Sequence, residues 1–284
     1  MNLYTINAGN FKLDGGAMFG VVPKSMWNKL NPADENNMCS WSMRCLLIEE
    51  NNKLILVDNG MGNKQDAKFF GHYYLHGDDT LERSLAKHGF SKNDVTDVFL
   101  THLHFDHCGG SIERSGDQLV PAFKNAMYWS NERHWKWATT PNDREKASFL
   151  KENILPIQQS GQLRFIDVAE QGTTSATQIL EGLEVYFAFG HTDAMMLPMI
   201  KYKEKTIAYM ADLLPAVAHL PLPYVMAYDM FPLTTLHEKR SFLNEAAAKD
   251  YILFFEHDPV NECCTLQQTD KGIRSRDIFR LEDI

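Results

Sequence analysis

The chain has 284 residues, of which 44% are hydrophobic, and a formal net charge of −9 at pH 7. We predict one domain over residues 1–284, with internal pseudo-symmetry between its halves, because this length and composition suffice for one large core. The acidic balance argues against a nucleic-acid partner, since phosphate binding requires a basic surface. No apolar run reaches the roughly 18 residues of a membrane span, and the first residues do not resemble a signal peptide. We therefore expect no membrane partner and a cytoplasmic location.

The first segment predicts a strand followed by a glycine-bearing loop. Leu3–Ala8 has the pattern of an edge strand, and Asn10–Val22 that of a loop or hairpin. Glycines surround apolar residues of this loop, among them Phe19. Two interpretations stay open for the range 10–38: a hairpin tip that packs on its own domain, or a loop that lines a substrate pocket and includes Phe19.

Met43–Glu49 and Lys53–Val57 predict two antiparallel strands joined at Asn51-Asn52. Asp58 ends the second strand. A buried carboxylate needs hydrogen-bond donors, and a metal-bound histidine needs an acceptor on its other nitrogen. We therefore expect Asp58 to orient a ligand and not to bind a metal itself; the alternative is a simple turn aspartate.

The most informative stretch is Thr101–Gly110, with the sequence Thr-His-Leu-His-Phe-Asp-His-Cys-Gly-Gly. It follows Asp97–Leu100, a short apolar run typical of a buried strand. The stretch offers four potential metal ligands: His102, His104, Asp106 and His107. Imidazole nitrogen suits zinc, iron and related metals, and a carboxylate extends the choice to harder ions. The alternative is a polar loop that contains three histidines by chance.

The segment after this motif predicts a strand at Ala126–Ser130 and a helix that begins at Asn131. Pro141-Asn142 followed by Glu145 predicts the start of a second helix, which runs to about Asn153. The aromatic residues around these helices are typical of core packing, and a contact with substrate is the alternative.

In the second half of the chain, three predicted strands are each followed by a histidine or an aspartate. The pairs are Leu183–Phe189 with His191, Thr206–Ala211 with Asp212, and Tyr251–Glu256 with His257.

A long apolar loop, predicted over 213–234, begins directly after Asp212. Such loops commonly form lids or pocket walls, and its candidates for substrate contact are His219, Tyr224 and Tyr228. For His219 three roles stay open: a polar loop histidine, an extra metal ligand or an acid–base group. Thr235–Glu238 matches a capping box and predicts a helix to about Asp250.

The order of these residues resembles the signature of the metallo-β-lactamase superfamily: His-x-His-x-Asp-His, a later histidine, an aspartate and a last histidine. The resemblance implies an α/β fold, a four-layer αββα sandwich. It also implies two divalent metal ions, one held by three histidines and one by a carboxylate and two histidines, with a bridging aspartate. The implied sets are His102, His104 and His191; Asp106, His107 and His257; and the bridge Asp212.

The resemblance further implies a hydrolase in which a metal-bound hydroxide attacks a small-molecule substrate. Asp106 and Asp212 would be its catalytic carboxylates, with Asp212 bridging the metals and Asp106 passing a proton to the leaving group. Zinc is the expected metal, and manganese, iron and cobalt are alternatives. The sequence leaves the oligomeric state open, with a homodimer among the options.

Within the superfamily, the motifs are most similar to those of acyl-homoserine lactonases and related organophosphate hydrolases, so a lactone or ester is the expected substrate. The alternatives are a phosphotriesterase-like enzyme, a thioesterase or a β-lactamase, and more remotely an iron-dependent oxidoreductase on the same scaffold. The lactonases usually place a tyrosine shortly after the bridging aspartate, where this chain has Leu213. Tyr224 or Tyr228 would have to replace that tyrosine.

Overall fold

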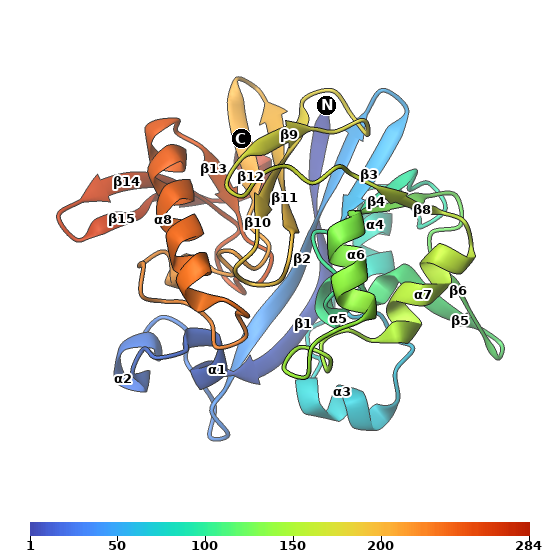
Figure 1. Cartoon of the computed structure of the whole chain (residues 1–284), viewed down its shortest axis with the longest axis horizontal. Coiled ribbons are helices and arrows are strands. Elements are labelled where there is room, and N and C mark those ends of the chain that lie inside the picture. The colour runs from blue at the N-terminus through green and yellow to red at the C-terminus, as the bar shows by residue number, and fades with distance from the viewer. The chain divides into compact units, whose positions relative to one another are not determined.

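The computed structural model describes all residues from 1 to 284 as a mixed α/β protein (Figure 1). The chain contacts divide it into two compact units. Unit 1 comprises Met1–Gly9 and Met43–Val168, and unit 2 comprises Asn10–Ser42 and Ala169–Ile284. No helix is both long and apolar enough to cross a bilayer.

Unit 1 is built on a sheet with the strand order β1-β2-β3-β4-β7-β8. The bounds are β1 Asn2–Asp14, β2 Met38–Glu50, β3 Lys53–Val57, β4 Asp97–Phe99, β7 Met127–Ser130 and β8 Leu163–Phe165; the far ends of β1 and β2 belong to unit 2. β2 and β3 form the predicted antiparallel hairpin, and Asn51 and Asn52 take the positive φ values of 49° and 64° that a tight hairpin turn requires. β3, β4, β7 and β8 are parallel.

The helices of unit 1 connect these parallel strands. They are α3 Ala67–Tyr73, α4 Leu81–Lys87, α5 Phe105–Cys108, α6 Glu132–Thr139 and α7 Lys151–Gln159, with a 3₁₀ turn Gly109–Ser111 and a small hairpin of β5 Ile112–Ser115 and β6 Gln118–Pro121. Thr80 caps α4, and Asn131, where a helix was predicted to begin, caps α6, each through its side-chain oxygen. One buried apolar cluster, which includes Leu47, Val98 and Ile154, packs the helices on the sheet.

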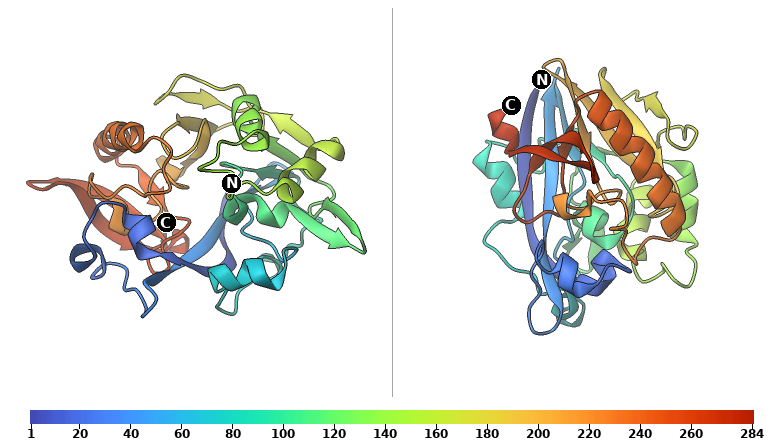
Figure 2. Two further views of the ribbon diagram at one scale, coloured as in Figure 1. Left: turned by 60° about the horizontal axis from the view of Figure 1, so that its bottom comes forward. Right: turned by 90° about the vertical axis from the view of Figure 1, so that its left-hand side faces the viewer.

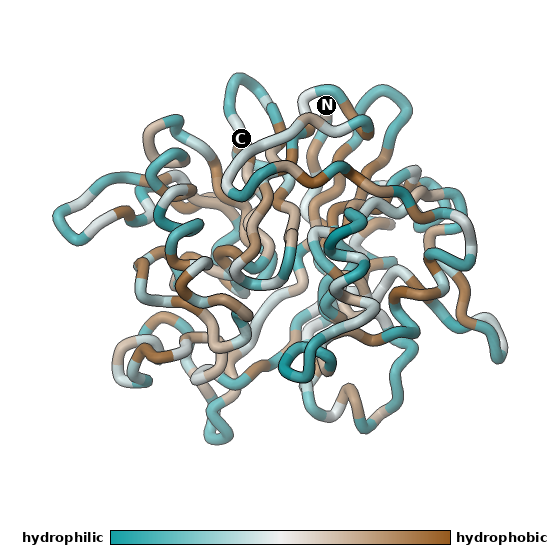
Figure 3. Tube along the Cα trace, in the orientation of Figure 1, coloured by the Kyte–Doolittle hydropathy of each residue, from teal (hydrophilic) through white to brown (hydrophobic).

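Unit 2 contains a second sheet with the order β15-β14-β13-β12-β11-β10-β9. Its strands are β9 Thr174–Ala176, β10 Leu183–Ala188, β11 Met195–Tyr202, β12 Lys205–Tyr209, β13 Ile252–Phe254, β14 Cys263–Thr269 and β15 Gly272–Phe279. Its helices are α1 Gly15–Phe19, α2 Lys24–Trp27 and α8 Pro232–Ala248, with 3₁₀ turns at Val217–His219 and Leu281–Asp283. α8 packs along this sheet (Figure 2). Hydrophilic residues mark the tip of the β14–β15 hairpin, while β10 to β12 are mainly hydrophobic (Figure 3).

Three predicted elements are wrong, and each has a local cause. The range Asn10–Val22 is not a loop, because β1 continues to Asp14, whose side chain accepts a hydrogen bond from Ala17 N and caps α1. No helix begins at Asn142. Its side-chain oxygen accepts from the backbone N of Arg144 and Glu145 and closes a turn, so the helix begins only at Lys151.

The predicted capping box at Thr235–Glu238 is also wrong. α8 begins three residues earlier, at Pro232, and proline is well suited to the first turn because its missing N–H is not needed there. The carboxylate of Glu238 instead accepts from the backbone of Phe189 and Gly190, directly after β10.

Candidate metal centre

Unit 1 gathers four potential ligands where β4 ends. His102 and His104 follow the strand, and Asp106 and His107 lie in the short helix α5. All four side chains are buried. Buried ionisable groups require partners, so their hydrogen bonds indicate what each group can bind.

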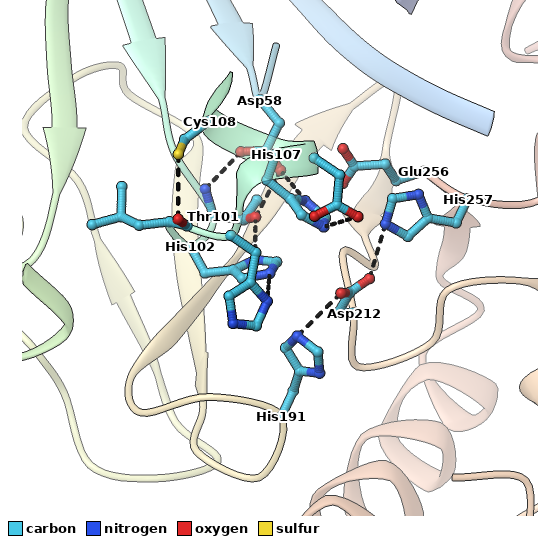
Figure 4. Close-up of polar contacts among 12 residues, drawn as sticks. Asp58, Thr101, His102, His107, Cys108, His191, Asp212, Glu256 and His257 are labelled. Carbon is cyan, nitrogen blue, oxygen red and sulfur yellow. Dashed lines mark hydrogen bonds and ion pairs between the residues drawn. The ribbon is translucent and has the colours of Figure 1, made fainter. Parts of the chain in front are cut away.

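A hydrogen-bond chain determines the tautomer of His102. Thr101 Oγ1 donates to Asp58 Oδ2 over 2.7 Å, because an ionised carboxylate can only accept. The same hydroxyl oxygen lies 3.0 Å from Nδ1 of His102 and accepts its proton. Nε2 of His102 then carries the lone pair. Figure 4 shows this chain from Asp58 through Thr101 to His102.

In His104 the lone pair lies on the other ring nitrogen, Nδ1. Its Nε2 donates to Oε1 of Glu145 over 2.9 Å, so Nδ1 carries the lone pair. This Nδ1 lies 3.1 Å from Nε2 of His102. Two such nitrogens repel one another unless a proton or a cation lies between them. Ligands about 2.0–2.1 Å from one tetrahedral zinc ion would lie about 3.3 Å apart, so the pair fits the donor set of a metal.

Asp58 ties the motif to β3. Its Oδ1 accepts from the backbone N of Thr101 at 2.8 Å, and its Oδ2 lies 3.1 Å from Nδ1 of His107. The other ring nitrogen of His107, Nε2, lies 3.9 Å from Oδ2 of Asp106, a second potential ligand. Asp58 adopts a φ of 55°, a conformation that costs a non-glycine residue energy and is concentrated at functional sites.

Unit 2 holds a second set of donors around Asp212. Its Oδ2 lies 3.1 Å from Nε2 of His191, and its Oδ1 lies 3.1 Å from Nε2 of His257 (Figure 4). The Nδ1 atoms of both histidines are already engaged, by Oδ1 of Asp229 at 2.8 Å and by the carbonyl oxygen of Ser42 at 2.7 Å. Both rings thus direct Nε2 toward one carboxylate, with an oxygen for each.

The charges in unit 2 favour a cation at this point. Burial lowers the pKa of His191, but the carboxylates of Asp212 and Asp229 outweigh burial and raise the pKa to about 10. The two carboxylates therefore stabilise positive charge at His191. A metal ion held by these residues would take the place of that proton.

The strand end before His191 is held against α8. The carboxylate of Glu238 accepts from the backbone N of Phe189 at 2.7 Å and of Gly190 at 3.0 Å. A Cβ on Gly190 would lie 2.3 Å from the backbone N of Thr235. Only glycine permits this approach, which sets the position of His191 relative to Asp229.

The pocket residues expected in the two loops lie in unit 2. Phe19 is fully buried, and its ring stacks between Trp27 and His219, with centroids 5.2 and 4.7 Å away. Tyr224 meets Phe19 edge-on at 6.1 Å, and Tyr228 is 37% exposed. Contact of these residues with substrate stays a prediction.

The side chain of His219 lies in the 3₁₀ turn Val217–His219 of the loop and is buried. Its Nε2 donates to the carbonyl oxygen of Met18 at 2.9 Å. Burial lowers the pKa of His219 to about 3, so the ring is neutral at physiological pH.

Several partners of the ligands were missed from the sequence: Thr101, Glu145, Asp229 and the carbonyl group of Ser42. Asp229 had a signal, since it is a lone carboxylate in an apolar, proline-bearing loop. Glu145 had none, because its partner His104 is 41 residues away in the chain.

Residues 44–257 match the model of the Metallo-beta-lactamase superfamily. The chain belongs to this superfamily. N-acyl homoserine lactonase AiiA of Bacillus thuringiensis subsp. kurstaki is 29% identical to it over 164 residues, which cover 54% of this chain and 56% of that protein. The N-acyl homoserine lactonase of Bacillus cereus is 27% identical over a stretch of the same length. The chain thus spans about half the length of the curated relatives it matches.

Solved structures confirm the expected α/β metallo-β-lactamase fold. A probable metal-dependent hydrolase from Staphylococcus aureus superposes with a TM-score of 0.87 at 26% identity, covering 100% of this chain and 98% of that one. AidC, a dizinc quorum-quenching lactonase in complex with a product, superposes with a TM-score of 0.78 at 21% identity. The superposition covers 96% of this chain and 93% of that one. The hydrolase AbOPH superposes with a TM-score of 0.77 at 20% identity, covering 98% of this chain and 94% of that one.

Proposed function

We propose that this protein is a dinuclear metal-dependent hydrolase that opens a lactone or another carboxylic ester. The observation that carries the proposal is the 3.1 Å approach of Nε2 of His102 to Nδ1 of His104, each carrying its lone pair. Asp212 supports it, with one oxygen 3.1 Å from each of two imidazole nitrogens. Membership of the superfamily supports a hydrolytic rather than a structural role for these donors.

The proposed assignment follows the order of ligands in the superfamily. One ion would be held by His102, His104 and His191, the other by Asp106, His107 and His257, with Asp212 bridging. Five imidazoles and two carboxylates form a donor set that accepts zinc, the metal we propose, as well as manganese, iron or cobalt. All seven side chains are buried, which limits competition from water.

Bound divalent ions would activate water at neutral pH and polarise the carbonyl oxygen of the substrate. The chain's own residues would orient the reaction. Asp229 and Glu145 fix the rings of His191 and His104 through their outer nitrogens. Asp106, which lies beside His107 in α5, is the proposed carrier of a proton to the leaving alkoxide.

Relatives support a lactone as the substrate, since the curated proteins that match are N-acyl homoserine lactonases. A phosphotriester is the second candidate, supported by the similarity to AbOPH in fold. We propose that Phe19, His219, Tyr224 and Tyr228 shape the pocket, with either tyrosine able to donate a hydrogen bond to the substrate. A homodimer and a cytoplasmic location stay predictions from the sequence.

The test is metal content of the purified protein by mass spectrometry, followed by assays with lactones, phosphotriesters and β-lactams. We expect about two ions per chain and lactone turnover, both reduced in Asp212→Asn and unchanged in Asp143→Asn, whose side chain is exposed. Fewer than one ion per chain after reconstitution, together with no turnover, would overturn the proposal. Turnover of phosphotriesters alone would keep the metal centre and replace the substrate.

A further inference from the structure

We propose that Glu145 is a positioning residue that fixes the metal-binding orientation of His104 and couples this ligand to the indole of Trp137. The inference rests on the proposed metal centre, because it assigns a task to a partner of one of its ligands. Glu145 lies in a turn between α6 and α7, and its side chain is almost completely buried.

Both carboxylate oxygens of Glu145 are engaged. Oε1 accepts from Nε2 of His104 at 2.9 Å, and Oε2 accepts from Nε1 of Trp137 at 2.6 Å. The side-chain amide of Asn142 adds a third contact to Oε2 at 3.3 Å. A carboxylate with partners on both oxygens cannot rotate without breaking one of them, so the direction of the His104 ring is fixed.

The turn that carries Glu145 is attached to the ligand motif at further points. The carbonyl oxygen of Ser148 accepts from the backbone N of Phe105 at 3.0 Å. The ring of Phe149 packs on the ring of His104, with centroids 4.8 Å apart. On the other side of the motif, Nε2 of His134 in α6 accepts from the backbone N of Leu103 at 2.9 Å. The backbone on both sides of His104 is therefore tied to α6 and the turn that follows it.

This arrangement should strengthen His104 as a ligand. A carboxylate that accepts from the outer nitrogen of a histidine orients the ring and increases the electron density on the metal-binding nitrogen. Loss of such a partner typically weakens metal affinity about 10- to 100-fold. A purely structural role for Glu145, as an acceptor for Trp137, would leave affinity unchanged.

Trp137 gives this inference a second readout. A metal that withdraws charge from His104 changes the field at Glu145 and hence at the indole hydrogen-bonded to it. Trp129 provides a matched control, because its Nε1 donates to Oδ1 of Asp97 at 2.8 Å, a contact of the same kind that does not involve a proposed ligand.

The experiment compares the wild type with Glu145→Ala, Glu145→Gln, Trp137→Phe and Trp129→Phe. Zinc affinity is measured by competition with a chromogenic chelator, and tryptophan fluorescence is recorded during zinc titration. We expect two zinc-binding steps, and Glu145→Ala should lower the zinc affinity of one of them about 10- to 100-fold. Glu145→Gln keeps an acceptor oxygen and should recover part of that loss. The fluorescence change should persist in Trp129→Phe and disappear in Trp137→Phe.

Each outcome is decisive. Unchanged affinity in Glu145→Ala, or a fluorescence change that survives in Trp137→Phe, would overturn the inference and leave the proposed function standing. Failure of the wild type to bind zinc would instead overturn the proposed metal centre. If Glu145→Ala does not fold, Glu145→Gln and the two tryptophan variants carry the test alone.

Discussion

Oδ1 of Asp229 lies 2.8 Å from Nδ1 of His191, and both side chains are buried. This contact joins the loop after Asp212 to the strand end of β10. It gives the loop a definite task, which is to hold one imidazole ring in a single orientation.

Replacement of Asp229 by alanine should weaken metal binding about 10- to 100-fold, because the Nδ1–H of His191 loses its acceptor and the ring is no longer fixed. Asp229→Asn, which retains an oxygen at Oδ1, should lose less metal affinity than Asp229→Ala. Metal affinity by chelator competition checks both variants, with Asp143→Ala as an exposed control. Equal affinities in all three proteins would contradict the orienting role.

Replacement of Gly190 by alanine should destabilise the protein and displace His191. The added Cβ would meet backbone and side-chain atoms of Thr235 at 2.3 Å, and backbone atoms cannot move aside as a flexible side chain could. We expect a loss of at least about 1–3 kcal/mol in the free energy of unfolding. Gly71→Ala is the matched control.

A Cβ on Gly71 meets nothing within 4 Å, and the residue lies in α3, so that substitution should stabilise the protein by up to about 1 kcal/mol. Urea denaturation measures both values. A Gly190→Ala variant as stable as the wild type would show that the strand end and α8 are not in close contact.

Replacement of Glu238 by glutamine should lower the free energy of unfolding by about 1–3 kcal/mol. An amide NH₂ would face the backbone N–H of Phe189 or Gly190, where a carboxylate oxygen accepts in the wild type. Glu132→Gln, on the exposed face of α6, removes only a surface ion pair and should change stability by less than about 1 kcal/mol. Thermal unfolding of the two variants checks this expectation. An equal loss of stability in both variants would contradict it.

Lys239 should make stability depend on pH. Its buried Nζ donates to the carbonyl oxygens of Pro221 at 2.7 Å and Tyr224 at 2.9 Å, and burial lowers the pKa from 10.5 to about 7. Between these two values the unfolded chain binds more protons than the folded chain. The contribution of Lys239 to stability is therefore present in full above pH 10.5 and is lost as pH falls toward 7.

The measurement is the difference in the free energy of unfolding between the wild type and Lys239→Met at several pH values. The difference should move in favour of the wild type as pH rises above about 7. A difference that is independent of pH would mean that the buried amine keeps its ordinary pKa.

The sequence predicted what depends on neighbouring residues. The hairpin of β2 and β3 follows from Asn51-Asn52, and the start of α6 follows from Asn131. The strands before the ligands follow from short apolar runs. Two of the failures also involve residues whose partners are distant. Glu145 and Glu238 both suggested helix starts, yet each carboxylate is used by a backbone or side chain more than forty residues away. Local patterns carry no signal for such contacts.

β1 and β2 each cross from one compact unit to the other, and this has a consequence for how the protein is made. Residues 10–42 leave the ribosome early but belong to unit 2, whose other part begins at Ala169. Until that part is synthesised, Ser42 lacks its acceptors in Glu256 and Asp258, and Ala17 lacks the amide of Ala227. Unit 1 can be completed during translation, whereas unit 2 must wait for the residues that follow Val168. We therefore expect a slow final folding phase that forms unit 2, and the proposed metal centre would be the last part of the molecule to assemble.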